Sequence, residues 1–217
     1  MKAVIFDLDG TLVDSIGVWK RVDDIVLARY GVNADDLYRE EIKMLTYMQC
    51  IEYIIEKFKI KKTAAELEKE FTAEALHEYG NNIRLKKGVK EFLEKIKQNG
   101  IKTAVLTSCR REMCEAVLKN NGIENYFDAV IYCEELGVNK SSEEAYIFTA
   151  KYINEEPSTC VVFDDLAKAC ESARKAGMTV IGIDDEENIG ERQLLEKVCD
   201  DIIEDFSDFY EIFVKYM

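Results

Sequence analysis

Histidine and proline are almost missing from this 217-residue sequence, which contains one of each, His77 and Pro157. A single histidine excludes a metal site built on several histidines and disfavours a Ser-His-Asp triad. Long apolar runs are also missing, so we expect neither a membrane-spanning helix nor a signal peptide. Positive charge is scarce, because 43 acidic side chains outnumber 29 basic ones and give a formal net charge of −14. This charge argues against nucleic acid or an anionic membrane as a partner.

Disulfide and zinc patterns are absent as well. The seven cysteines are odd in number and form no C-x-x-C pair. Several lie in apolar runs, as Cys160 does before Val161-Val162-Phe163. This usage is typical of buried, reduced thiols, and we expect a cytoplasmic protein.

Short apolar segments alternate with amphipathic helical patterns from Leu85 onward. This alternation predicts an α/β fold in which helices cover both faces of a parallel sheet. The predicted strands are 4–6, 103–106, 129–132, 160–163, 179–183 and 201–203.

Residues 15–83 show helical periodicity and no convincing strand, so we expect an all-helical domain there. It is inserted into a core domain formed by residues 1–14 and 84–217. Thr63-Ala64-Ala65-Glu66 and Ser141-Ser142-Glu143-Glu144 both have the pattern of a capping box at the start of a helix.

The most informative stretch is Asp7-Leu8-Asp9-Gly10-Thr11, which follows the first predicted strand directly. Two carboxylates at the end of a buried strand are costly unless a cation neutralises them. Mg²⁺ is the simplest candidate, because hard divalent cations prefer oxygen ligands.

Further polar residues follow other predicted strands. Ligands of open parallel sheets bind beyond the carboxyl ends of the strands, so these residues are expected at one edge. Carboxylates, hydroxyls and an ammonium group together suit a metal ion and a phosphate. The residues are Thr107 and Ser108, Asp164 and Asp165, and Lys140 in a loop before a helix.

These motifs resemble those of the haloacid dehalogenase (HAD) superfamily. Asp7-Leu8-Asp9-Gly10-Thr11 is similar to its first motif, Thr107 to its hydroxyl motif, Lys140 to its lysine motif, and Asp164-Asp165 to its acidic pair. The helical insertion between the first two motifs resembles the helical-cap subfamily that includes phosphoglycolate phosphatase and β-phosphoglucomutase. The resemblance implies a Rossmann-like, HAD-type core with an inserted helical cap.

The resemblance also implies a Mg²⁺-dependent phosphatase that hydrolyses a small phosphorylated metabolite through an aspartyl-phosphate. Asp7 would attack phosphorus, and Asp9 would protonate the leaving alcohol and then activate water. The cap would close over the substrate and exclude bulk water. The resemblance assigns catalysis to Asp7, Asp9, Thr107 and Lys140, phosphate binding to Thr107, the Ser108 backbone amide and Lys140, and the metal to Asp7, the Asp9 carbonyl, Asp164 and Asp165.

Three positions depart from the family pattern without removing a catalytic group. Ser141 replaces the proline that often follows the lysine, Leu166 replaces a common serine after the acidic pair, and Ala169 replaces a usual glycine.

Alternative functions stay open at this point. A sugar phosphomutase resembling β-phosphoglucomutase shares the core motifs, and a non-catalytic HAD-fold binding module is the alternative from another class. Asp9 argues against dehalogenation, and no motif singles out a cap lysine for phosphonate hydrolysis. We expect a monomer or weak homodimer. Candidate cap contacts to the leaving group are Trp19, Lys20, Lys43 and Tyr47.

Overall fold

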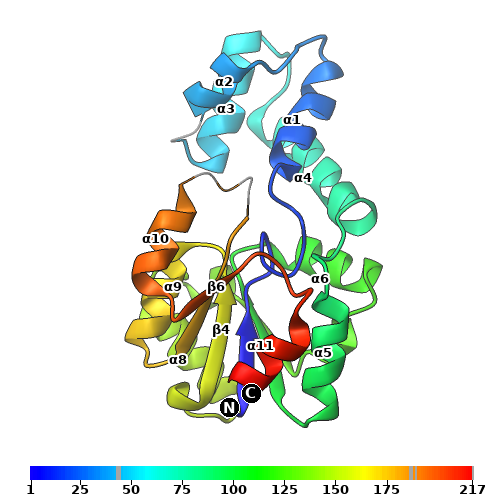
Figure 1. The fold of residues 1–217 in the computed structure, drawn as a ribbon. Helices are drawn as coiled ribbons and strands as arrows, with labels where there is room; N and C mark the ends of the chain where they lie inside the picture. Colours follow the sequence, from blue (N-terminus) through cyan, green and yellow to red (C-terminus); the bar gives the residue numbers. More distant parts are fainter. Residues whose placement is uncertain (43–44, 186–187, 189, 217) are drawn as a thin grey trace. The chain divides into compact units, whose positions relative to one another are not determined.

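A computed structural model describes residues 1–42, 45–185, 188 and 190–216. Its core is a six-stranded, wholly parallel sheet in the order β3-β2-β1-β4-β5-β6 (Figure 1). This confirms the predicted α/β fold class. The strands are β1 (Ala3–Phe6), β2 (Lys102–Thr107), β3 (Ala129–Tyr132), β4 (Cys160–Asp164), β5 (Thr179–Ile183) and β6 (Asp201–Ile203).

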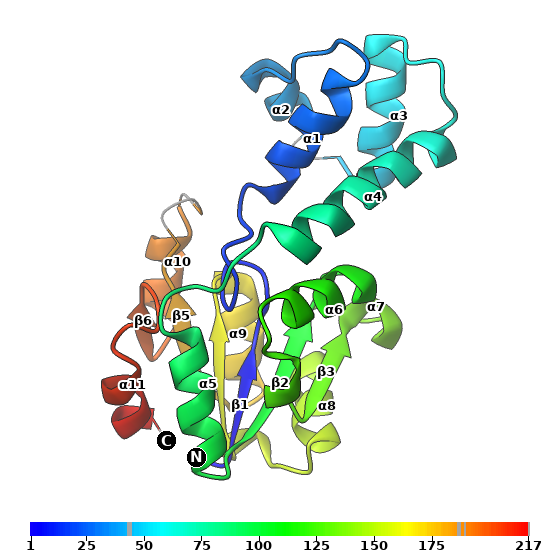
Figure 2. The same ribbon diagram turned by 90° about the vertical axis from the view of Figure 1, so that its right-hand side faces the viewer.

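The helices follow the strands in the alternating order that a parallel sheet requires. Figures 1 and 2 show α8 and α9 on one side of the sheet and α5 on the other. In the core unit the helices are α5 (Val89–Gln98), α6 (Arg111–Asn120), α7 (Cys133–Leu136), α8 (Glu143–Tyr152), α9 (Ala167–Lys175), α10 (Glu191–Val198) and α11 (Phe209–Tyr216), with short 3₁₀ helices at Glu124–Tyr126 and Pro157–Thr159.

Both faces of β1 are buried, which explains why this strand is a continuous apolar run. Ile5 belongs to a core of small and aliphatic side chains shared with α8 and α9. Phe6 points the other way and stacks on Phe163, with ring centroids 5.4 Å apart. Phe92 of α5 packs edge-on against Phe163 at 5.6 Å. Since β1 is held from both sides, the residue that follows it has a fixed position.

The chain forms two compact units, one from Met1–Ile16 and Ile83–Met217 and one from Gly17–Asn82. The second unit is helical, and its assignment as a cap domain stays a prediction. Tyr30 donates a hydrogen bond to Glu70 at 2.8 Å, which links the segment after α1 to α4. The helices of this unit are α1 (Val18–Ala28), α2 (Asp36–Ile42), α3 (Tyr47–Phe58) and α4 (Ala64–Asn81).

One predicted capping box is confirmed and the other is wrong. Thr63 caps α4 and Glu66 returns the bond. At α8 the cap is Ser142, whose hydroxyl accepts from the amide of Glu144, while Ser141 bonds to Asn139. Two adjacent serines let the helix start one residue later than the four-residue pattern predicts.

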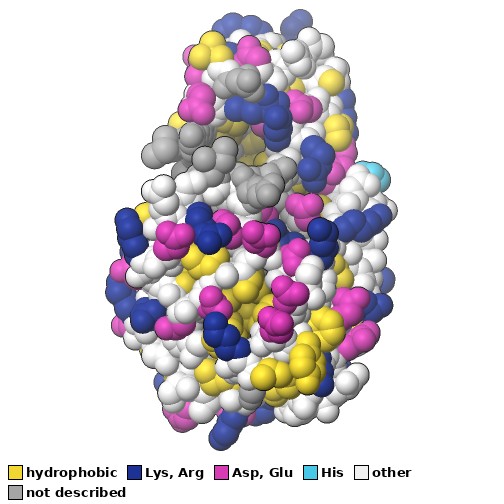
Figure 3. All heavy atoms as spheres, viewed as in Figure 1, with side chains coloured by type: hydrophobic (Ala, Val, Ile, Leu, Met, Phe, Trp, Pro, Cys, Tyr) yellow, Lys and Arg dark blue, Asp and Glu magenta, His cyan; other side chains and the backbone are white. Residues whose placement is uncertain are grey.

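The surface of the protein carries charged side chains of both signs (Figure 3). On the face seen in Figure 3, acidic and basic side chains are interspersed. Across the described part of the chain, no helix is long and apolar enough to span a bilayer. All seven cysteines are free thiols, four of them buried.

Candidate active site

Asp7 lies at the point where the sheet changes its winding direction. β2 pairs with one edge of β1, and β3 follows on the same side. β4 pairs with the opposite edge of β1. Ligands of doubly wound sheets bind at this switch point, beyond the carboxyl ends of the strands. The Asp7 amide donates to the carbonyl of Phe163 at 2.9 Å, so the pairing of β1 with β4 continues to Asp7. This register places Asp7 beside Asp164.

Lys140 joins these two carboxylates. It lies in the loop between α7 and α8 and is 8% exposed. Its Nζ is 2.5 Å from Asp7 Oδ1 and 2.5 Å from Asp164 Oδ2. A buried ammonium between two carboxylates compensates charge on both. The structure therefore unites three sequence-predicted residues from three separate motifs.

Asp165 completes an acidic cluster with Asp7 and Asp164. One carboxylate oxygen from each lies within 4.8 Å of the others, and all three residues are buried. When ionised, three carboxylates beside the single ammonium of Lys140 leave a formal charge of −2. Burying this excess is costly without a counter-charge, and oxygen donors in this arrangement suit a hard divalent cation. The residues present therefore fit the predicted metal.

Burial and the neighbouring charges together shift the pKa values of the cluster. Burial, reinforced by Asp164, raises the pKa of the Asp165 carboxyl to about 7. Burial raises the pKa of Asp7 well above its ordinary value, although Lys140 opposes the shift. Burial alone would lower the pKa of Lys140, but the facing Asp164 and Asp7 outweigh it and raise that pKa well above its usual range. The two facing carboxylates therefore favour the charged form of Lys140.

Gly10 gives the acidic cluster its space. Its φ is +76°, and a Cβ added there would lie 2.5 Å from Asp165 Oδ2. The turn after β1 therefore needs glycine for its left-handed backbone and for the close approach of Asp165.

We expect Gly10→Ala to reduce turnover at least tenfold, because the new methyl group displaces the Asp165 carboxylate. Gly122→Ala is the matched control, since Gly122 has φ +64° with nothing within 4 Å of an added Cβ. Gly122→Ala should lose about 1 kcal/mol of folding stability through backbone strain, and Gly10→Ala should lose more because its Cβ also collides with Asp165. Equal turnover in the two variants, measured as kcat/KM, would show that contact with Asp165 is unimportant.

Asp9 is half-buried and is not one of the three clustered carboxylates, although its charge helps to raise the pKa of Asp7. Its Oδ1 accepts a hydrogen bond from the hydroxyl of Ser15 at 2.7 Å. The Ser15 side chain is buried, so it holds the Asp9 carboxylate in one orientation. Sequence reasoning gave Ser15 no role, since an isolated serine carries no signal of its partner.

Thr107 and Ser108 lie at the carboxyl end of β2, the strand next to β1. Thr107 is buried, and its hydroxyl accepts from the Cys109 amide at 2.9 Å. Ser108 is exposed. Neither residue caps α6, whose N-cap is Arg110. The Thr107 hydroxyl therefore shapes the loop at the sheet edge instead of starting the helix.

Two further residues touching the cluster were missed from sequence. Tyr146 of α8 is fully buried, with its hydroxyl 3.5 Å from Asp164 Oδ2. Asn188 follows β5 and donates to Asp165 Oδ2 at 3.0 Å. The spacing of Tyr146 along the chain predicts a core residue, and Asn188 belongs to none of the motifs. The sequence therefore gives no signal of either contact.

The predicted leaving-group contacts belong to the helical unit. Trp19 is 44% exposed, and its ring lies 5.6 Å from that of Tyr47. Lys20 is exposed, and Lys43 lies outside the described residues. Trp19 and Tyr47 thus form an aromatic pair in the helical unit, and the contact of these residues with a leaving group stays a prediction.

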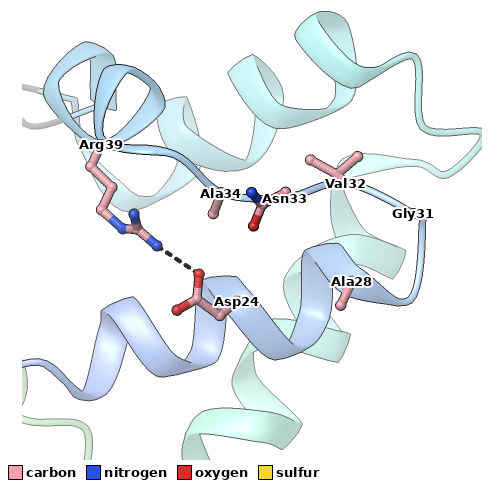
Figure 4. Close-up of a pocket in the computed structure, with 7 residues that line it drawn as sticks. All are labelled: Asp24, Ala28, Gly31, Val32, Asn33, Ala34 and Arg39. Carbon is pink, nitrogen blue, oxygen red and sulfur yellow. Dashed lines mark hydrogen bonds and ion pairs between the residues drawn. The ribbon is translucent and has the colours of Figure 1, made fainter.

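A pocket of about 480 Å³ also lies within the helical unit, at the connection of α1 and α2 (Figure 4). Arg39 forms an ion pair of 2.6 Å with Asp24 there. None of the predicted site residues lines it.

Comparisons with known proteins cover most of the chain. Residues 4–183 match the family described as haloacid dehalogenase-like hydrolase. A phosphorylated carbohydrates phosphatase of Thermotoga maritima is 28% identical over 179 residues, 82% of each chain. Hexitol phosphatase B of Escherichia coli is 26% identical over 184 residues, 82% of each chain.

Solved structures share the fold over the full chain. A Thermotoga maritima protein determined as a candidate β-phosphoglucomutase gives a TM-score of 0.89 at 25% identity and covers 100% of both chains. A predicted phosphoglycolate phosphatase of Haemophilus somnus gives 0.79 at 22% identity and covers 98% of both. The Rossmann-like, HAD-type fold predicted from the motifs is confirmed.

Proposed function

Because the chain belongs to the haloacid dehalogenase-like hydrolase family, we propose that it is a Mg²⁺-dependent phosphatase of a small phosphorylated carbohydrate or related metabolite. The observation that carries the proposal is the buried cluster of Asp7, Asp164 and Asp165 around Lys140. Its excess charge of two suits a divalent cation, and its ammonium suits a phosphate oxygen. The phosphatases among its relatives support this class of substrate.

Asp7 is the proposed nucleophile. Its position directly after the central strand gives it a fixed orientation, as in-line attack on phosphorus requires. Attack by the Asp7 carboxylate forms a bond to phosphorus, breaks the bond to the leaving alcohol and gives an aspartyl-phosphate. Asp7, Asp164, Asp165 and the backbone carbonyl of Asp9 would hold Mg²⁺, which would supply the positive charge that offsets repulsion between carboxylate and phosphate.

Asp9 is the proposed proton carrier. Oriented by Ser15, it protonates the leaving alcohol and later takes a proton from the water that hydrolyses the intermediate. Lys140 neutralises the transferring oxygens, with Thr107 and the Ser108 amide as further donors to them.

The proposal is tested by measuring phosphate release from sugar phosphates, sugar-alcohol phosphates, nucleotides and phosphoglycolate, with Mg²⁺ or with a chelator. We expect Mg²⁺-dependent release from at least one phosphorylated carbohydrate. No release from any ester with Mg²⁺ present would favour a non-catalytic binding module that retains the fold.

A sugar phosphomutase is the second candidate, because the solved structure with a TM-score of 0.89 was determined as a candidate β-phosphoglucomutase. Both reactions use the same proposed aspartyl-phosphate and differ in whether water or a sugar hydroxyl accepts the phosphoryl group. With glucose 1-phosphate as substrate, we expect free phosphate. Accumulation of an isomeric sugar phosphate instead would establish the mutase. We also propose, from the free thiols, that the protein is cytoplasmic.

A further inference from the structure

Asn188, between β5 and α10, is bonded to one member of the acidic pair, although it belongs to no recognised motif. Asn188 donates from Nδ2 to Asp165 Oδ2 at 3.0 Å. Glu191, the first residue of α10, accepts from the amide of Ala167 at 2.8 Å, two residues after Asp165. Asp185 forms an ion pair with Lys86, whose own amide donates to Leu12 in the turn after β1. Of these bonds, the one from Asn188 reaches the acidic cluster itself, and those of Asp185 and Glu191 hold their residues to neighbouring parts of the core unit.

The Asn188 contact acts on one defined oxygen. Asp165 Oδ2 is also the atom that would lie 2.5 Å from a Cβ at Gly10. This oxygen therefore lies beside the place that a side chain at position 10 would fill, and the Asn188 amide is its hydrogen-bond donor. Rotation of an aspartate carboxylate about its last torsion is otherwise broad. Fixing Oδ2 sets the direction in which the other oxygen of Asp165 points.

The chemistry of an amide donor also suits this place. Lys140 already compensates Asp7 and Asp164, and a second ammonium would halve the formal excess of negative charge that favours a divalent cation. A neutral amide stabilises the Asp165 carboxylate through one hydrogen bond and leaves its charge in place. Hydrogen-bond partners that orient ligating carboxylates affect metal affinity strongly.

We infer that Asn188 is a positioning residue that holds the Asp165 carboxylate in the orientation required to bind the divalent cation. The inference rests on the proposed function, since it concerns the same metal. It extends the site from the four recognised motifs to the segment after β5.

The test is calorimetric titration of the metal-free, full-length protein with MgCl₂, comparing the wild type with Asn188→Ala. We expect about tenfold weaker Mg²⁺ binding by the variant, the lower end of the effect typical of such partners. At saturating Mg²⁺ its kcat and KM for a phosphate ester should approach the wild-type values, because the catalytic groups are unchanged.

Arg192→Ala is the matched control. It tests whether loosening the segment between β5 and α10 weakens Mg²⁺ binding when the contact of Asn188 with Asp165 is kept. Arg192 pairs with Asp184 at the start of the same segment and is half-exposed. We expect Arg192→Ala to bind Mg²⁺ within about twofold of the wild type, since this exposed pair contributes little. Metal-free Asn188→Ala should melt close to the wild-type temperature.

Each other outcome has a distinct meaning. If the wild type binds Mg²⁺ and Asn188→Ala binds it equally well, the positioning role is wrong and the proposed function stands. Equal weakening in both variants, or a large fall in the melting temperature of metal-free Asn188→Ala, would assign Asn188 a structural role instead. If the wild type does not bind Mg²⁺, the metal dependence of the proposed function fails as well.

Discussion

Asp7→Asn should abolish turnover of every phosphate ester that the wild type hydrolyses, with a loss of roughly 10⁴-fold or more in kcat, as expected for removal of a nucleophile. The amide is nearly the same size as the carboxylate, but its oxygen is a far poorer nucleophile. Asp7 is buried against Lys140, and an uncharged residue there lowers the charge excess of the cluster. The folded structure should therefore persist while catalysis is lost.

The measurement is initial-rate phosphate release at saturating Mg²⁺, with circular dichroism to establish folding. Asp208→Asn is the matched control, because Asp208 is an exposed aspartate before α11, and it should keep wild-type rates. Wild-type turnover by Asp7→Asn of an activated phosphate ester would exclude Asp7 as the nucleophile.

Lys140→Met should have the second largest effect, because it removes the cation shared by Asp7 and Asp164. Methionine retains most of the aliphatic stem, so the change is mainly electrostatic. Removing one partner of a buried ion pair typically costs about 3–5 kcal/mol, since a buried charge is left uncompensated. We expect a loss of this order in the metal-free protein, together with a large fall in kcat from the missing phosphate contact.

Urea denaturation of the metal-free variant and steady-state kinetics with Mg²⁺ measure the two effects separately. Lys151→Met, at an exposed position of α8, should leave stability and turnover near wild type. Activity of Lys140→Met at the wild-type level would mean that Lys140 only balances charge and does not contact the substrate.

The sheet and much of the site could be predicted because local patterns determine them. The strands are short and largely apolar, and parallel pairing brings their carboxyl ends to one edge of the sheet. The proximity of Asp7, Lys140 and Asp164 follows from this topology and from the order of the motifs along the chain. Pattern reasoning works here because each of these residues has its position set by the end of a strand or by the loop next to it.

What sequence could not predict depends on contacts between distant segments. Asn188 meets Asp165 across 23 positions, and no periodicity marks an asparagine in a loop as a partner. The short α7 and the terminal α11 were also not predicted, since segments of four and eight residues give few turns of helical periodicity. The misplaced capping box at Ser141 shows that two adjacent capping residues leave a helix start ambiguous by one position.

The most direct test of the proposed mechanism is a rapid-quench experiment with an activated phosphate ester and Mg²⁺, followed by mass spectrometry of the peptide that contains residue 7. An activated leaving group lets formation of the intermediate outpace its hydrolysis. The mechanism predicts a burst of alcohol equal to the enzyme concentration, with one phosphoryl group on Asp7 in the same time range. Phosphorylation of a different residue, or simultaneous release of alcohol and phosphate from the first turnover without a modified Asp7, would contradict it.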